Sequence, residues 1–184
     1  LSVHPDAVVF GTGATEANNS VLLAPLLAGG ERRHVVTTAV EHPSVLAPAA
    51  LLESRGWRVT RIPVDAEGRV DPAQLVRAID AETALVCVIW ANNETGVIQP
   101  VEEIAAGVRE HGVPLHLDAT QALGKWPVDL SRLPVDSVAL SAHKFGGPKG
   151  AGCLVALGTQ PPPVWLRGGG QERGRRGGTP NVPG

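Results

Sequence analysis

Apolar residues along the chain follow two alternating patterns. Short runs of β-branched and other apolar residues, typical of buried strands, alternate with longer segments in which apolar residues recur at helical spacing. The short runs predict strands at residues 7–10, 34–38, 57–62, 84–90, 114–117, 135–140 and 153–157. The longer segments predict helices at residues 15–27, 44–54, 72–79 and 101–110. This alternation predicts an α/β fold, with a mainly parallel sheet flanked by helices on both faces.

Polar residues follow five of the predicted strands. They stand in the segments GTGATEANN, AVEHPS, ANNETG, DATQALGK and SAHK. Ligands of parallel sheets collect beyond the carboxyl ends of the strands. Turns also need polar residues, but five such groups at one rim predict a single shared site.

Glycine and threonine dominate the first of these polar groups. Gly11, Gly13, Ala14 and Thr15 begin like a dinucleotide-binding loop, but the third glycine is absent and no lysine follows, as a phosphate loop requires. The free amides and the dipole at the start of the next helix still favour a phosphate group. Two interpretations therefore remain open, a phosphate-binding helix start and an ordinary capping turn.

Two ionisable side chains stand after runs that are otherwise apolar. Asp118 follows PLHL, and Lys144 follows VALSAH. A buried charge is costly without a partner, and burial would make the amine of Lys144 a nucleophile near neutral pH. Taken singly, Asp118 could cap a helix that begins at Thr120, and Lys144 could be a surface residue. Together, an amine for an aromatic aldehyde and an acid for a ring nitrogen predict a pyridoxal phosphate site.

Composition agrees with a soluble globular protein about one domain long. Of the 184 residues, 43% are hydrophobic and 18% are charged, and the formal net charge is -2. This balance gives no electrostatic case for nucleic acid or an anionic membrane, and neither a transmembrane nor a leader pattern occurs. We therefore expect a cytoplasmic protein. Cys87 and Cys153 lie in separate apolar runs, so we expect two core thiols and no metal site.

Six motifs occur in order along nearly the whole chain: GATEANN, VEHPSVL, ANNETGVIQP, HLDATQALGK, SAHKFGGPKG and GGGQERGRRGGT. In order and spacing they resemble the NifS/IscS-like cysteine desulfurases, which are class V aminotransferase-fold enzymes. The resemblance implies the large domain of fold type I pyridoxal 5'-phosphate enzymes, working as a homodimer. It also implies a reaction that converts L-cysteine to L-alanine and an enzyme persulfide. The persulfide would supply a sulfur-acceptor or scaffold protein in iron-sulfur cluster or thio-cofactor synthesis.

The same resemblance assigns roles to residues within the motifs. Lys144 would form the imine with the cofactor's aldehyde, and Asp118 would pair with the ring nitrogen. His42 would stack on the ring and move protons, unless it only caps the helix after Pro43. Asn93 would contact the cofactor or the substrate carboxylate, unless it is a plain turn residue. Gln121 would reach the phenolic oxygen of the cofactor. The phosphate would be held by Ala14, Thr15, Ser141 and His143, and the second subunit would contribute its Thr179.

The chain departs from the family's pattern where the sulfur chemistry should be. The resemblance implies a cysteine on a mobile loop well beyond the lysine, an arginine in a C-terminal small domain, and an amino-terminal arm. None of these is recognisable here, and Cys153 lies only nine residues after Lys144, inside an apolar run. The chain also lacks methionine. We therefore expect residues 1–184 to be the cofactor-binding core of a longer desulfurase, inactive by itself.

Other interpretations of the sequence remain open. A selenocysteine lyase, or another class V aminotransferase or lyase, would use the same cofactor for a different reaction. A non-catalytic scaffold module would keep only the fold, although it has no need for Lys144 opposite Asp118. The arginines of GGGQERGRRGG could also form a short RNA-binding tail.

Overall fold

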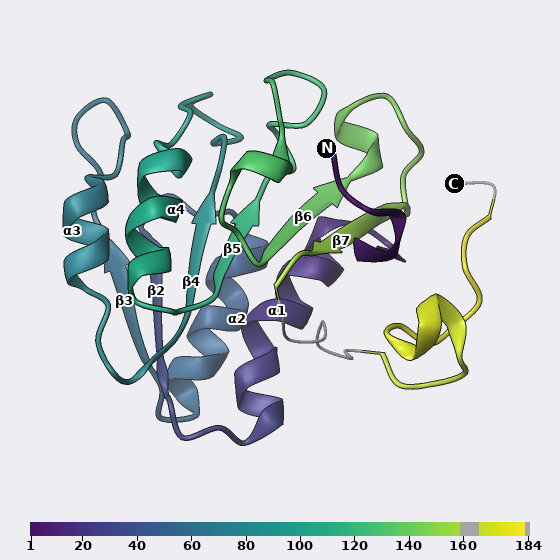
Figure 1. The fold of residues 1–184 in the computed structure, drawn as a ribbon, viewed down its shortest axis with the longest axis horizontal. Helices are drawn as coiled ribbons and strands as arrows, with labels where there is room; N and C mark the ends of the chain where they lie inside the picture. The colour runs from purple at the N-terminus through teal and green to yellow at the C-terminus, as the bar shows by residue number, and fades with distance from the viewer. Residues whose placement is uncertain (159–165, 183–184) are drawn as a thin grey trace.

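A seven-stranded sheet forms the centre of the computed structural model, which describes residues 1–158 and 166–182. Its strands lie in the order β1-β7-β6-β5-β4-β2-β3 (Figure 1). The strands from β6 to β3 run parallel, and β7 is antiparallel to both of its neighbours. The mainly parallel sheet is thus confirmed, with one reversed strand. The strand bounds are β1 Val8–Gly11, β2 His34–Thr38, β3 Arg58–Ile62, β4 Thr83–Ile89, β5 Leu115–Asp118, β6 Ser137–Ser141 and β7 Gly152–Ala156.

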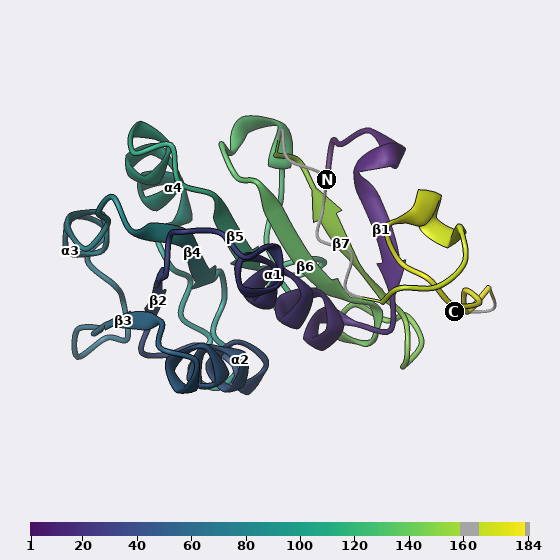
Figure 2. The same ribbon diagram turned by 90° about the horizontal axis from the view of Figure 1, so that it is seen from below.

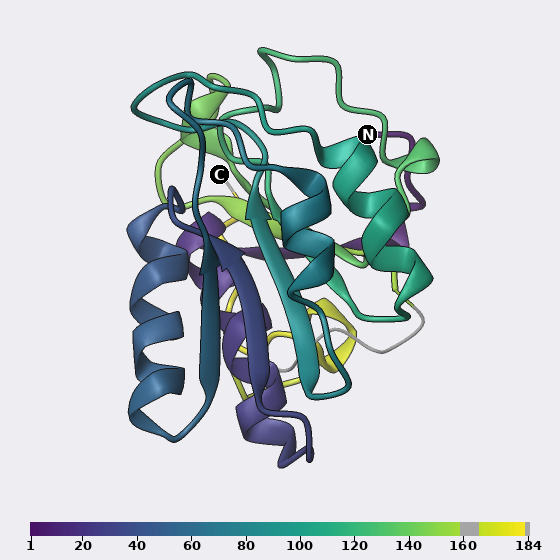
Figure 3. The ribbon, with the colours of Figure 1, turned by 90° about the vertical axis from the view of Figure 1, so that its left-hand side faces the viewer.

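Helices cover both faces of the sheet, as Figures 2 and 3 show. Helices α1 (Ala14–Ala28) and α2 (Pro43–Ser54) pack on one face, and α3 (Pro72–Arg77) and α4 (Val101–Glu110) pack on the other. The sheet therefore separates two hydrophobic cores, one that includes Leu22 and Leu52 and one that includes Ile104 and Leu117. Every predicted strand and helix is found within two residues of its expected bounds.

Four short 3-10 segments complete the described elements: η1 (Pro5–Ala7), η2 (Leu130–Arg132), η3 (Ala142–Lys144) and η4 (Gln171–Gly174). Segment η3 directly follows β6, so the SAHK motif turns away from the sheet as soon as the strand ends. Among the helices of the described residues, none has the length and apolarity that a membrane crossing needs.

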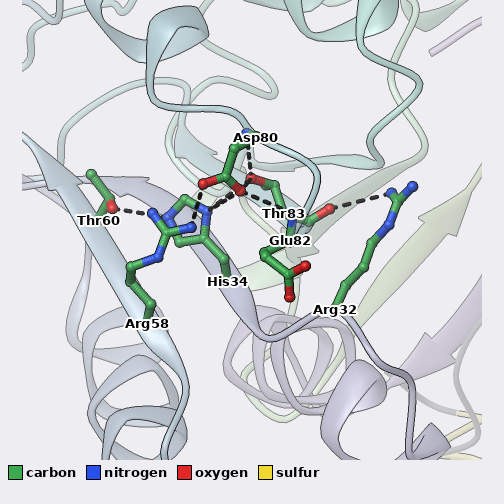
Figure 4. A network of polar contacts seen from close by, with 7 residues as sticks. All are labelled: Arg32, His34, Arg58, Thr60, Asp80, Glu82 and Thr83. Atoms are coloured by element: carbon green, nitrogen blue, oxygen red, sulfur yellow. Dashed lines mark hydrogen bonds and ion pairs between the residues drawn. The ribbon is translucent and has the colours of Figure 1, made fainter.

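A polar network joins three strands near their amino ends (Figure 4). The buried ring of His34 on β2 is bonded through Nδ1 to the Thr83 hydroxyl on β4 and through Nε2 to the Thr60 hydroxyl on β3, each at 2.8 Å. Asp80 accepts from the Thr83 hydroxyl and pairs with Arg58. Burial and the nearby Arg58 charge lower the pKa of His34, so its ring is neutral at neutral pH. This network stabilises the sheet at the rim opposite the polar motifs.

The segment 166–182 packs beside the free edge of β1 (Figure 2). The Glu172 carboxylate accepts a hydrogen bond from the backbone N–H of Phe10 at 2.9 Å. Such bonds block an edge strand that could otherwise pair with another chain. Three arginines of this segment are also bonded within the chain, which disfavours a free RNA-binding tail: Arg173 to Asp6, Arg175 to the Val8 carbonyl and Arg176 to Glu16.

Gly152 on β7 permits a close approach between that strand and the loop before α1. A Cβ atom at residue 152 would lie 2.5 Å from both the Gly13 Cα and the Leu140 carbonyl oxygen, and neither backbone atom can swing aside. We therefore expect Gly152→Ala to lower the free energy of unfolding by about 1–3 kcal/mol, the usual cost of overpacking. Urea denaturation measures this. The control Gly30→Ala, where a Cβ meets nothing within 4 Å, should change stability by less than about 0.5 kcal/mol.

Candidate active site

A cavity of about 200 Å³ lies where β4, β5 and β6 end and where α1 and α2 begin. Its position is the one that the rule for parallel sheets predicts. All but one of the candidate site residues line it: Ala14, Thr15, His42, Asn93, Asp118, Gln121, Ser141, His143 and Lys144. Ser44, Ile89, Ala91 and Thr120 also line it.

Helix α1 begins at the wall of this cavity without a side-chain cap. Its first residues are Ala14 and Thr15, and the preceding Gly13 offers no side chain to the first helical amides. A Cβ at Gly13 would lie 3.1 Å from the Ser141 hydroxyl oxygen, so the glycine lets the helix start approach the end of β6. The Ser141 hydroxyl is 3.1 Å from Nδ1 of His143. Free amides, a hydroxyl and an imidazole at a helix start suit an anion such as phosphate.

Asp118, the last residue of β5, is a buried carboxylate with no positive partner. The residue is 3% exposed; Oδ1 accepts from the Thr120 N–H at 3.0 Å and Oδ2 accepts from Asn18 Nδ2 at 2.8 Å. No ion pair to Asp118 occurs within residues 1–158 and 166–182. The expected cap at Thr120 is present, but turns follow it in place of a helix. A buried charge in this state is suited to a cationic ligand group in the cavity.

Lys144 lines the same cavity as Asp118. It lies in η3, after the strand, and is only partly buried. The expectation of a buried lysine at the strand end is therefore wrong in detail, because β6 ends at Ser141 and the chain turns outward before Lys144. The amine can still be reached from the cavity.

His42 both caps α2 and lines the cavity. Its Nδ1 accepts the backbone N–H of Ser44 at 3.1 Å and lies 2.8 Å from the Ser44 hydroxyl. A backbone N–H can only donate, so Nδ1 is an acceptor and the neutral ring carries its hydrogen on Nε2. The capping alternative and the cavity role thus coexist, because they use different nitrogens of one ring.

The two asparagines of ANNETG have separate positions. Asn92 holds the turn: its Nδ2 donates to the Val40 carbonyl at 2.9 Å, and its Oδ1 accepts the N–H groups of Glu94 and Thr95. Asn93 is exposed and lines the cavity. The turn role therefore falls to the first asparagine, and the second remains available for a ligand.

Gln121 lies in the turns that follow Asp118. Its side-chain oxygen accepts a hydrogen bond from the Lys125 amine one turn later. The amide nitrogen of Gln121 is left to donate toward a ligand oxygen.

Glu41, the residue before His42, is a buried acid whose importance the sequence does not reveal. Its Oε1 accepts from the Thr38 hydroxyl at 2.7 Å and from the Ile89 N–H at 2.8 Å, whereas the buried Oε2 has no partner among the described residues. Burial, with a smaller contribution from the charge of Asp118, raises the pKa of Glu41 to about 8. Glu41 is therefore mostly protonated at neutral pH, which avoids a second negative charge near Asp118.

Neither cysteine is placed to act as a nucleophile. Cys87 is fully buried, as expected for a core thiol, and burial raises its pKa well above the ordinary value. Cys153 is only partly buried, so the expectation of a core position holds less well there; burial raises its pKa to about 11. A thiol with a raised pKa is a poor nucleophile near neutral pH.

Thr179 is the one candidate residue that does not line the 200 Å³ cavity. It lines a second, mainly apolar cavity of about 470 Å³ together with Phe10, Phe145 and Cys153. Its assignment to a phosphate site shared between subunits stays a prediction.

Asn18 and Ser44 contribute to the site and were not singled out from the sequence. Asn18 is fully buried, and its side chain joins Ser44 to Asp118. A signal existed, because Ala14, Asn18 and Val21 recur at helical spacing and so share the buried face of α1. A polar residue on that face must have a buried partner.

Comparison with known proteins gives consistent matches along the chain. The family model for class-V aminotransferases matches residues 1–184. A cysteine desulfurase of Enterobacter agglomerans is 44% identical over 184 residues, which are 100% of this chain and 46% of that protein. A cysteine desulfurase of Gluconacetobacter diazotrophicus is 49% identical over 179 residues, which are 96% of this chain and 44% of that protein. The chain thus spans about half the length of the curated relatives it matches.

Solved structures match the fold closely. A structure described as SspA in complex with cysteine aligns with a TM-score of 0.95 at 36% identity, covering 100% of this chain and 54% of that one. A NifS-like protein aligns with a TM-score of 0.96 at 41% identity, covering 100% of this chain and 51% of that one. These matches agree with the large domain of fold type I enzymes.

Proposed function

Because this chain belongs to the class-V aminotransferase family, we propose that it is the cofactor-binding core of a pyridoxal 5'-phosphate-dependent cysteine desulfurase. One observation carries the proposal. The buried carboxylate of Asp118, which forms no ion pair among the described residues, and the amine of Lys144 line one cavity at the carboxyl ends of the strands. An acid for a ring nitrogen and an amine for an aldehyde are the two groups that this cofactor requires.

The residues present fit the cofactor at each of its polar groups. Asp118 would hold the ring nitrogen in its protonated form, which gives the buried carboxylate its missing positive partner. Gln121 would donate its amide N–H to the phenolic oxygen. The uncapped start of α1 at Ala14 and Thr15, with Ser141 and His143, would hold the phosphate.

Two further side chains that line the cavity, Lys144 and His42, could transfer protons. The bound cofactor supplies an electron sink for the carbanion that forms at the substrate's Cα. Lys144, whose amine lines the cavity, would take up and return a proton during this chemistry. His42 offers the Nε2–H, since Nδ1 is occupied by Ser44. Asn93, which is exposed and lines the cavity, would contact the substrate carboxylate.

The substrate that we propose is L-cysteine. In the balanced reaction, L-cysteine and an enzyme thiol give L-alanine and an enzyme persulfide. Cys87 and Cys153 do not suit the role of that thiol because both are buried to some degree and have raised pKa values. We therefore place the sulfur-accepting cysteine outside these 184 residues, in the half of the relatives' length that the chain does not span.

We further propose a homodimer that works in the cytoplasm and passes its sulfur to an acceptor or scaffold protein. Thr179 lies outside the cavity formed by the other candidate residues, which is consistent with a role in a second subunit. Both cysteines are free thiols, as is usual in a reducing compartment.

Spectroscopic titration tests the proposed function. After incubation with pyridoxal phosphate and removal of unbound cofactor by gel filtration, the purified chain should remain yellow, and L-cysteine should then change the absorbance because it competes with Lys144 for the aldehyde. The chain alone should form no persulfide. A colourless protein after gel filtration would favour a non-catalytic scaffold, and persulfide formation by the chain alone would contradict the placement of the acceptor thiol elsewhere.

A further inference from the structure

The side chain of Asn18 is the centre of a hydrogen-bond chain beneath the cavity. Asn18 is 0% exposed, and all of its side-chain bonds go to buried or partly buried groups. Its Nδ2 donates to Asp118 Oδ2 and to the Ser44 hydroxyl, each at 2.8 Å, and its Oδ1 lies 2.9 Å from Nε2 of His116. These partners come from β5 and from the start of α2, so one amide joins α1 to two other elements.

Chemistry sets the direction of every bond in this chain. The ionised Asp118 carboxylate can only accept, so the Asn18 atom facing it must be the NH2 group. Asn18 Oδ1 then faces His116, whose Nε2 must donate. The other nitrogen of His116, Nδ1, lies 2.8 Å from the Ser137 hydroxyl and accepts from it. On the other branch, the Ser44 hydroxyl accepts from Asn18 and donates to Nδ1 of His42.

His116 is well suited to remain a neutral donor in this arrangement. It is fully buried, and burial lowers its pKa to about 4, although the charge of Asp118 acts in the opposite direction. The ring therefore keeps a single hydrogen near neutral pH, and the bond to Asn18 requires that hydrogen on Nε2.

We infer that Asn18 is a positioning residue, whose amide orients the Asp118 carboxylate toward the cavity and, through Ser44, holds the ring of His42. Asn18 itself does not line the cavity, so it acts only through these partners. The inference rests on the proposed function in one respect, that the group met by Asp118 is the ring nitrogen of pyridoxal phosphate.

Removal of the Asn18 amide is expected to lower the affinity for pyridoxal phosphate, and the size of the loss should depend on the ring nitrogen of the ligand. Without Asn18, Asp118 Oδ2 loses its only hydrogen-bond donor among the described residues, and the carboxylate can turn away from the ring. A hydrogen bond to a charged group is worth on the order of tenfold or more in affinity. The loss should appear only for a ligand whose ring nitrogen Asp118 can bind.

Two variants and a matched control test this idea. Asn18→Leu keeps the approximate shape of the side chain and removes its hydrogen-bond donor and acceptor without adding a charge beside Asp118, and Asn18→Ala removes the whole amide. The control is Asn19→Ala at the next position, where the side chain bonds to backbone carbonyls of Thr15 and Ser44. The ligands are pyridoxal phosphate and its deaza analogue, in which a carbon replaces the ring nitrogen.

We expect both Asn18 variants to bind pyridoxal phosphate about tenfold or more weakly than the wild type and to bind the deaza analogue nearly as well as the wild type does. Asn19→Ala should change neither affinity. An equal loss for both ligands would show that Asn18 only supports the fold, and no loss would show that Asp118 does not need it. Either result overturns the inference.

The histidine resonances of the ligand-free protein give a second and independent test. Nitrogen-15 NMR should place the His116 hydrogen on Nε2 in the wild type and in Asn19→Ala, with altered signals for His116 and His42 in Asn18→Leu. A hydrogen on Nδ1 of His116 in the wild type would overturn the hydrogen-bond chain. If the wild type bound neither ligand, the proposed function would fail, and these resonances alone would decide whether Asn18 orients Asp118 and His42.

Discussion

Lys144→Ala is expected to abolish covalent attachment of pyridoxal phosphate. The amine of Lys144 is the one lysine amine that lines the 200 Å³ cavity within the described residues, and alanine offers no nucleophile to the aldehyde. Borohydride reduction converts the cofactor's imine to a stable amine, and mass spectrometry of the peptides then locates it. In the wild type, we expect the modified peptide to contain Lys144; in the variant, we expect no specific modification.

The modified residue can be identified without ambiguity because the only lysines in the sequence are Lys125, Lys144 and Lys149. Lys149 lies five residues after Lys144 and is exposed, so Lys149→Ala is a control that should leave the yield of trapped cofactor unchanged. Specific modification of Lys125 or Lys149 in the wild type would contradict the role of Lys144, even if the protein bound the cofactor. Loss of binding without unfolding in Lys144→Ala, checked by circular dichroism, would support it.

Glu41→Gln is expected to stabilise the protein at alkaline pH. The pKa of Glu41 is about 8 in the folded state, against an ordinary value of 4.5. Between these two pH values the folded state holds a proton that the unfolded state has released, so the free energy of unfolding falls as pH rises through this range. Above pH 8, the difference between these two pKa values lowers the free energy of unfolding by about 5 kcal/mol in total. Glutamine keeps an uncharged group of the same shape and avoids this loss.

Urea denaturation at pH 4 and at pH 9 measures the effect. The variant and the wild type should have similar stability at pH 4, where Glu41 is protonated in both states, and the variant should be several kcal/mol more stable at pH 9. Glu103→Gln, which changes an exposed acid on α4, is the matched control for replacing a glutamate by glutamine at the surface. Equal stability of Glu41→Gln and the wild type at pH 9 would mean that Glu41 is ionised in the folded protein.

His116 opposes Glu41 over part of this range. Its pKa is lowered to about 4 from an ordinary 6.5, so the unfolded state binds the extra proton between those values and stability rises with pH there. In the wild type the two effects largely cancel between pH 4.5 and 6.5, and the fall due to Glu41 emerges above pH 6.5. In Glu41→Gln, the rise due to His116 should be seen alone.

In this site, some groups form structural hydrogen bonds while neighbouring groups remain available to a ligand. Asn92 holds a turn while Asn93 lines the cavity, and Nδ1 of His42 caps a helix while Nε2 is left for chemistry. Glu41 stays protonated so that the charge of Asp118 is not doubled. In each case, one group supplies structure and leaves its neighbour free for a ligand.

Much of the fold and of the candidate site follows from local sequence. Strand and helix positions depend on apolar spacing and on turn residues, and these are properties of short segments. The shared rim follows from the sequence because parallel strands place their carboxyl ends together, and this predicts that Asp118, Lys144 and His42 lie at one place. The motifs then indicated which chemistry those residues serve.

Only the tertiary structure decided the reversed direction of β7, the partly exposed position of Lys144, the protonation of Glu41 and the partners of Asn18. The direction of β7 is set by its pairing with both β1 and β6. Asn18 and Asp118 are 100 residues apart in sequence, and their bond exists because α1 packs over the end of β5. A pKa depends on how many atoms exclude water from a group and on which charges lie near it. The spacing of apolar residues predicts which side of a helix or strand is buried, but it does not predict which residues of other elements contact that side.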